Sequence, residues 1–161
     1  MSPTIVRGLI DGYIDIAYVF GIPVIDSQED VTVTQGVDEH SVWVRSRDFV
    51  QRPGVPIPIL AWPGGDWMIR TLTKHNIWYK IVFRSPNHQL RLEAARAGFG
   101  LTAMPERMVP SFLVSAKDYY LPELPGHKRL LCARPGLEGS RATALVRRLS
   151  TLFFKRTKPM R

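Results

Sequence analysis

The stretch "RLEAARAGFGLTAMP", residues 91–105, combines two periodic patterns separated by a glycine. Up to Ala97, the apolar residues Leu90, Ala94 and Ala97 follow one another at spacings of four and three, which predicts a helix with one buried face. Gly98 suits the end of that helix, because glycine tolerates the left-handed conformation. After it, an apolar run predicts a short buried strand, in which Gly100 favours close packing against a neighbour. The stretch contains no candidate catalytic residue.

The same alternation of helix and strand patterns extends over the rest of the chain. Asp66 is a plausible N-cap, and Ser85 followed by Pro86 is a helix-start signature. We expect strands over 13–20, 31–35, 41–46, 57–62, 77–83, 99–105 and 128–135, and helices over 3–11, 67–76, 86–97 and 138–154. This order predicts an α/β fold with mainly parallel sheets flanked by helices.

Composition restricts the classes of function. The chain has 161 residues, of which 45% are hydrophobic, and no apolar run approaches the ~20 residues that cross a membrane. Cys132 is the only cysteine, so an internal disulfide is excluded and a reducing, cytoplasmic setting is favoured. The four histidines lack metal-ligand spacing, and we expect neither a metal nor a cofactor.

The net charge is +8, which is compatible with nucleic acid or an anionic ligand as a partner. Much of this charge lies in the C-terminal stretch "RATALVRRLSTLFFKRTKPMR". That stretch also has an apolar face (Ala144, Leu145, Leu149, Leu152 and Phe153), which we expect to be buried. A basic chain end of this kind more often forms a solvated helix face than a DNA-binding surface.

Four stretches in this order resemble the effector-binding (substrate-binding) domain of LysR-type transcriptional regulators. They are "LIDGYIDIAYVF" (9–20), "HSVWVRSRDF" (40–49), "VPIPILAWPGGDWMIR" (55–70) and "SPNHQLRLEAARAGFGLTAMPERMV" (85–109). The resemblance implies the two-lobed fold of type II periplasmic binding proteins, with a ligand in the cleft between the lobes. It places residues 1–42 and 114–161 in a first lobe and residues 43–113 in the second.

The resemblance also implies parts that this sequence lacks. In a full regulator of the family, a DNA-binding winged helix-turn-helix, a linker helix and the first strand and helix of the first lobe precede the stretch that matches residue 1. We therefore expect an incomplete first lobe and contact with DNA only through the missing N-terminal domain. Strand 13–20 would then have an open edge, so we also expect a homo-oligomer.

Candidate site residues follow from the same resemblance. Ser85, Asn87 and His88 stand at a helix start that the family directs into the cleft, where free N–H groups attract anions. The turn "WPGGDW" offers Trp62, Gly64 and Gly65 as a second wall, and Phe20 and Gly21 end a strand at the expected cleft edge. The strands that cross between lobes supply Val44, Gly100 and Thr102 as a hinge.

Each of these candidates also has a purely structural interpretation. Ser85 can be a helix cap and nothing more, the Gly-Gly turn can be a tight connection, and Phe20 can be a core residue. Asp15 and Cys132 are expected to be structural.

The function that the resemblance implies is sensing of a small, anionic effector, without enzymatic activity. One alternative is a solute-binding protein of a transport system, which the missing signal peptide disfavours. The others are a small α/β enzyme, for which no catalytic constellation is visible, and a stand-alone DNA binder that uses the basic tail.

Overall fold

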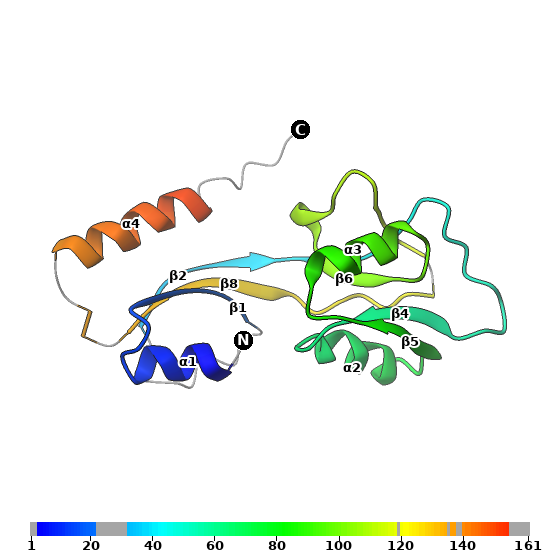
Figure 1. Ribbon diagram of the computed structural model, residues 1–161, viewed down its shortest axis with the longest axis horizontal. Helices are drawn as coiled ribbons and strands as arrows, with labels where there is room; N and C mark the ends of the chain where they lie inside the picture. The colour runs from blue at the N-terminus through cyan, green and yellow to red at the C-terminus, as the bar shows by residue number, and fades with distance from the viewer. Residues whose placement is uncertain (1–2, 22–31, 119, 135, 138–139, 155–161) are drawn as a thin grey trace. The chain divides into compact units, whose positions relative to one another are not determined.

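The computed structural model describes residues 3–21, 32–118, 120–134, 136–137 and 140–154. The chain divides into two units. Unit 1 comprises Met1–Glu39 with His127–Arg161, and unit 2 comprises His40–Gly126. Figure 1 shows the elements of each unit along the chain.

The described helices are α1 (Pro3–Ile10), α2 (Asp66–Lys74), α3 (His88–Arg96) and α4 (Ser140–Phe154), with a single 3-10 turn at Glu106–Met108. The described strands are β1 (Ile16–Gly21), β2 (Thr32–Glu39), β3 (Ser41–Arg45), β4 (Ile57–Ala61), β5 (Tyr79–Arg84), β6 (Thr102–Pro105), β7 (Val114–Ser115) and β8 (His127–Ala133). Helices and strands of the α/β class are confirmed.

Unit 1 is built on a three-stranded sheet in the order β1-β8-β2, and both pairings are antiparallel. Ile16 faces Ala133 and Gly21 faces Lys128, so the first and last parts of the chain share one sheet, as expected. Helix α1 covers this sheet: Leu9 packs with Ala17, Val19, Leu130 and Cys132. Val6 is also buried in this helix, whereas Ile10, one turn later, is 40% exposed.

The apolar residues of α4 whose side chains are described are not buried as expected, and the Phe153 side chain lies outside the described part of the chain. Leu145 is 50% exposed and Leu152 is 66% exposed, while Leu149 is half-buried. The helix contacts β2, yet none of its residues belongs to a core cluster among the described residues. Amphipathic patterning identified the helix, but it does not specify which surface covers the apolar face.

In unit 2, β4 and β5 pair in parallel and are joined through α2, as parallel strands require. Strand β3 pairs antiparallel with both β6 and β7. Leu101 joins the two sheets, because its N–H donates to Pro58 O at 2.9 Å and its carbonyl accepts from Leu60 N at 2.8 Å. The sheets are therefore mixed, and the expected mainly parallel pairing is wrong: strands that return from the other unit, such as β8, pair antiparallel.

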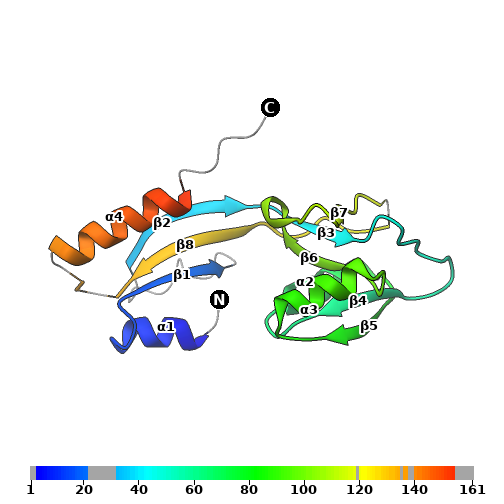
Figure 2. The ribbon, with the colours of Figure 1, turned by 45° about the horizontal axis from the view of Figure 1, so that its top comes forward.

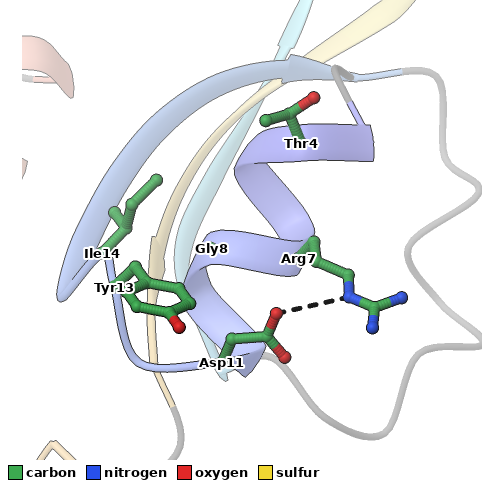
Figure 3. A pocket seen from close by; sticks show the side chains of 6 residues that line it. All are labelled: Thr4, Arg7, Gly8, Asp11, Tyr13 and Ile14. Atoms are coloured by element: carbon green, nitrogen blue, oxygen red, sulfur yellow. Dashed lines mark hydrogen bonds and ion pairs between the residues drawn. The ribbon is translucent and has the colours of Figure 1, made fainter.

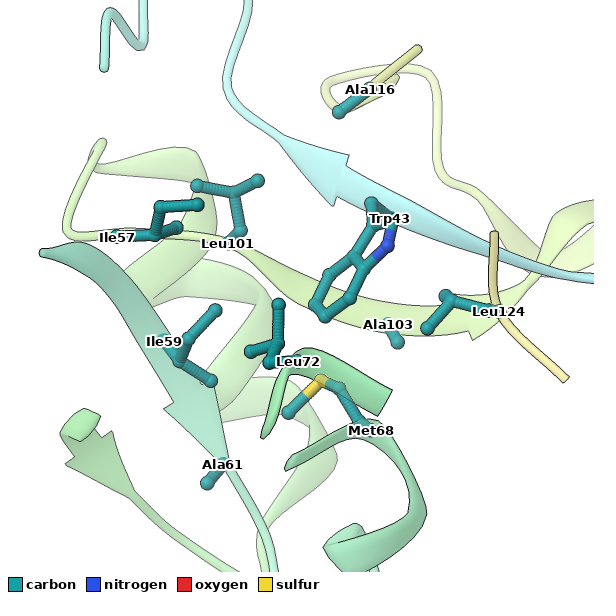
Figure 4. Close-up of a cluster of buried hydrophobic side chains, with 10 residues drawn as sticks. All are labelled: Trp43, Ile57, Ile59, Ala61, Met68, Leu72, Leu101, Ala103, Ala116 and Leu124. Atoms are coloured by element: carbon teal, nitrogen blue, oxygen red, sulfur yellow. The ribbon is translucent and has the colours of Figure 1, made fainter. Parts of the chain in front are cut away.

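The two faces of β4 carry two separate clusters, as the two-residue period of a strand requires. Ile57, Ile59 and Ala61 pack with Met68 and Leu72 of α2 (Figure 4). Leu60 packs instead with Leu92 and Ala95 of α3. Helices α2 and α3 thus cover opposite faces of β4, in the ribbon of Figure 1 as in the contacts, and Figure 2 shows β5 beside β4.

Helix starts differ in detail from the sequence prediction. Gly65, not Asp66, is the N-cap of α2, and no side chain caps that helix. Asn87, not Ser85, caps α3 with its side chain. Helix α3 buries Arg91, Leu92 and Ala95, whereas Leu90 is 55% exposed. The buried face of α3 was predicted wrongly because it contains Arg91, and an arginine on a helix usually indicates a solvent-exposed position.

Residues 114–126 pack within unit 2, although we expected them in the first lobe. Trp43 explains the difference: its Nε1–H donates to Pro122 O at 2.8 Å, and its carbonyl accepts from Ala116 N at 2.8 Å. Arg45 also forms an ion pair with Asp118 at 3.1 Å. The chain passes between the units at 39/40 and 126/127.

Candidate functional site

The carboxyl ends of the parallel strands β4 and β5 lie side by side, and each strand is followed by the start of a helix. Just beyond β5, the Ser85 N–H donates to Ala61 O at 3.1 Å and extends the pairing by one residue. In open α/β sheets, ligands bind outside the carboxyl ends of the strands. We call this region the β4–β5 site and define it by Trp62, Gly65, Ser85, Asn87, His88 and Arg91.

Ser85 and Asn87 fix the chain at the start of α3. The Ser85 Oγ accepts from Asn87 N at 3.1 Å, and the Asn87 Oδ1 accepts from Leu90 N at 3.2 Å. Ser85 is 8% exposed, whereas Asn87 is exposed. By helix geometry, the N–H groups of His88 and Gln89 remain without an intrahelical acceptor and are open to an anion.

The Trp62 ring packs against three residues, Gly65, Trp67 and Arg91. A Cβ on Gly65 would lie 2.8 Å from the Trp62 ring, so glycine is needed where the ring packs on that turn. Trp67 meets the ring edge-on, with centroids 5.9 Å apart. The Arg91 guanidinium carbon lies 4.3 Å from the centroid of Trp62, within cation–π range.

Arg91 was not among the residues predicted from the sequence. It is 6% exposed, and its guanidinium Nη2 donates to His88 Nδ1 at 2.8 Å. Because a guanidinium has no acceptor atom, Nδ1 of His88 must be unprotonated in this contact. Leu92 and Ala95 follow Arg91 by one and four positions, and this helical spacing could have indicated that Arg91 lies on the buried face.

Burial shifts the protonation equilibria of this pair. The pKa of His88 is lowered from its ordinary value near 6.5, first by burial and second by the charge of Arg91. Burial also lowers the pKa of Arg91 from its ordinary value, although an arginine stays charged at any physiological pH. The site therefore combines a neutral imidazole with a fixed positive charge.

The structure brings Trp62, Gly65, Ser85, Asn87 and His88 together in unit 2, and Gly64 stands beside Gly65 in the same turn. The Gly65 N–H donates to Trp62 O at 3.0 Å inside the turn, so it is not free for a ligand, while Gly64 is exposed with φ 89°. Phe20 and Gly21 end β1 in unit 1, and the Phe20 side chain is not among those that the structure describes.

The three candidate hinge residues lie inside unit 2. Val44 faces Thr102 across the β3–β6 pair, and the Thr102 Oγ1 donates to Leu60 O at 2.9 Å. Gly100 leaves room for a backbone contact, because a Cβ there would lie 2.4 Å from Pro58 O. Their role as a hinge stays a prediction.

A surface hollow of about 530 Å³ lies in unit 1, and none of the predicted site residues is among those that line it. Figure 3 shows the side chains of Thr4, Arg7, Asp11, Tyr13 and Ile14 around it, together with the backbone of Gly8. Arg7 and Asp11 form an ion pair at 3.3 Å, and Tyr13 is 88% exposed. These groups give it no unpaired buried charge.

Other chemistry finds little support in the described part of the chain. No group of three or more His, Cys, Asp or Glu side chains there could hold a metal ion. The pKa of the Cys132 thiol is raised from 9.0 by burial, which disfavours the reactive thiolate. No helix among the described residues is long and apolar enough to span a membrane.

The sequence matches the family model of the LysR substrate binding domain over residues 1–151. The chain belongs to the LysR substrate-binding domain family. The fold is accordingly that of the type II periplasmic binding proteins, and the domain is the ligand-sensing part of a LysR-type regulator.

Solved structures of LysR-type regulators share this fold at low sequence identity. The regulatory domain of HypT from Salmonella typhimurium, bound to bromide, has a TM-score of 0.73 and 17% identity, with 94% of this chain and 78% of that chain covered. The regulatory domain of CcmR from Synechocystis PCC6803, in complex with 2-PG, has a TM-score of 0.70 and 14% identity, with 98% and 81% covered. Full-length HypT, a hypochlorite-specific LysR-type transcriptional regulator from Salmonella, matches with a TM-score of 0.73 and 17% identity, and 94% of this chain covers 56% of it.

Proposed function

We propose that this LysR substrate-binding domain recognises its small-molecule effector through the β4–β5 site of unit 2. The observation that carries the proposal is the convergence of five sequence-predicted residues at the carboxyl ends of β4 and β5. Trp62 offers an aromatic surface, Asn87 and the first turn of α3 offer polar groups, and His88 offers a neutral imidazole. Together they provide one apolar wall and several hydrogen-bonding groups, which is the usual composition of a small-molecule site.

The site supports binding and not catalysis. Ser85 Oγ is engaged by the Asn87 N–H, and among the described residues no histidine hydrogen-bonds to it as a general base would. His88 is engaged with a cation instead. We therefore propose that the chain acts as a sensor and has no enzymatic activity.

Sensing requires the effector to bind one arrangement of the regulator better than another. We propose that the chain passages at 39/40 and 126/127, where the two units join, allow the arrangement to change, and that Val44, Gly100 and Thr102 act with them. Residues 1–39 with 127–161 and residues 40–126 would then be the two lobes. We propose that DNA is contacted through a separate N-terminal domain and that the regulator is a homo-oligomer.

A screen of small metabolites, charged and neutral, against the thermal unfolding midpoint tests the site. At 100 times its dissociation constant, a ligand should stabilise the chain by about 2.7 kcal/mol. Trp62→Leu and Ser85→Ala should reduce that stabilisation. Trp78→Leu is the matched control, because Trp78 is 65% exposed in the same unit and outside the site. Compounds that stabilise the chain equally in all three variants, or only through Tyr13 in unit 1, would contradict the proposal.

A further inference from the structure

Arg91 is a buried positive charge without a negative partner among the described residues. It is 6% exposed, its Nε has no hydrogen-bond acceptor there, and no carboxylate forms an ion pair with it there. A second arginine of the same helix provides the contrast: Arg96 is exposed and lies 3.8 Å from Glu93. Isolated buried charges are costly, so proteins pair them or use them to bind.

The contacts that Arg91 does make compensate its charge only in part. Stacking on Trp62 contributes a cation–π interaction, and a single hydrogen bond goes to a neutral nitrogen of His88. A charged acceptor binds a guanidinium about twice as strongly as a neutral one, and with bidentate geometry. His88 lies at the surface, with only part of its ring covered. It can therefore leave its place as acceptor without the loss of core packing.

We infer that Arg91 is the residue that selects a negatively charged oxygen group on the effector, and that this oxygen takes the acceptor position which His88 Nδ1 holds in the structure. The inference rests on the proposed function of the β4–β5 site and names its ligand class: a small molecule that carries a carboxylate, sulfate or comparable oxyanion. The exposed first turn of α3 assists, because its N–H groups also favour negative charge.

An arginine that selects a ligand differs from a merely structural arginine in its effect on the stability of the ligand-free protein. A structural arginine stabilises the ligand-free protein, so its removal lowers the unfolding midpoint. A buried charge that awaits its partner costs stability, so an apolar replacement of similar size leaves the midpoint unchanged or raises it.

The experiment measures the thermal unfolding midpoint of the chain in sodium acetate and sodium sulfate series, against sodium chloride at equal ionic strength and against neutral acetamide. We expect saturable stabilisation by at least one of the two oxyanions and none by acetamide. Arg91→Met should weaken the apparent affinity for that oxyanion about 30-fold or more. Arg91→Lys, which keeps the charge without the planar group, should retain a weaker response. Arg96→Met, with the same charge change on the same helix, should respond like the unaltered chain.

Three results would overturn the inference: no oxyanion effect beyond that of chloride in the unaltered chain, an equal response in Arg91→Met, or a marked loss of stability of Arg91→Met in chloride alone. The metabolite screen keeps this failure distinct from failure of the proposed function. A neutral compound whose binding depends on Trp62 and Ser85 but not on Arg91 would retain the site and remove its anion selectivity.

Discussion

The protonation state of His88 makes the charge of the β4–β5 site, and with it the stability of the chain, depend on pH. Its pKa lies below the ordinary value near 6.5, because burial and the nearby Arg91 disfavour the imidazolium. Between the lowered pKa and 6.5 the unfolded chain binds more protons than the folded chain, so stability rises with pH across this window. The contribution of His88 is complete above about pH 6.5 and is lost as the pH falls through the folded pKa.

A proton NMR titration of the His88 ring measures this directly. We expect a midpoint below 6.5, and Arg91→Met should raise it only in part, because burial is the larger cause. Over the same pH window, His88→Gln should flatten the dependence of stability on pH. A His88 midpoint at or above 6.5 would contradict this account of the site.

Substitution of Gly100 tests the close backbone contact with Pro58, at the point where Leu101 joins the two sheets of unit 2. A Cβ there would lie 2.4 Å from Pro58 O, a backbone atom that cannot yield without moving β4. Gly100→Ala should therefore lower the free energy of unfolding by about 1–3 kcal/mol, the usual cost of overpacking. Urea unfolding measures the change.

Gly126→Ala is the control, because a Cβ at Gly126 meets nothing within 4 Å. It should be neutral, or stabilising by about 0.4–1 kcal/mol through the unfolded chain. Equal destabilisation by the two substitutions would mean that the contact between Gly100 and Pro58 has no special weight.

At the scale of elements, α3 positions most of the site. Asn87→Ala removes the side-chain oxygen that accepts from Leu90 N, so it should cost about 1 kcal/mol of stability and loosen the first turn. Gln89→Ala, an exposed position in that turn, should be neutral or slightly stabilising, because alanine favours helix. Urea midpoints that fall equally in both variants would exclude a capping role for Asn87.

The sequence allowed most elements and their order to be predicted, because apolar runs and glycine or proline boundaries mark them locally. Pairing direction was not predictable in the same way, since β1 and β8 are distant in sequence and only tertiary contact decides it. At the start of α3, Ser85 and Asn87 are both good caps two residues apart, and the choice depends on where β5 ends. Sequence patterns therefore located the helix start within two residues and no closer.

The site itself was predictable only where backbone features reveal it. Trp62, Gly65, Ser85 and Asn87 adjoin helix starts that sequence patterns mark. Arg91 was missed because a charged residue on a helix usually indicates a solvent-exposed position, whereas the packing of Leu92 and Ala95 against β4 shows that this face is buried. The exposure of Leu145 and Leu152 on α4 was missed for the converse reason. An apolar stripe on a helix predicts burial but does not show which surface covers it.

At the scale of the whole molecule, the exposed side chains Leu145 and Leu152 of α4 predict self-association. Sedimentation velocity at increasing concentration should show assembly, and Leu145→Glu with Leu152→Glu should weaken it by placing charges on the shared face. Val50→Glu is the control, since Val50 is 78% exposed in the other unit. A monomer at every concentration, or an equal effect of the control, would mean that α4 does not contribute an interface.

If the effector is recognised at the carboxyl ends of β4 and β5, amide chemical shifts report that location most directly. A nitrogen–proton correlation spectrum is recorded while a compound from the metabolite screen is titrated into the chain. We predict that the largest saturable shifts fall on the amides of Gly64, Gly65, Asn87, His88 and Gln89 and on the indole N–H of Trp62. Shifts confined to the surface hollow of unit 1, around Gly8 and Tyr13, with the β4–β5 site unchanged, would contradict recognition at the β4–β5 site.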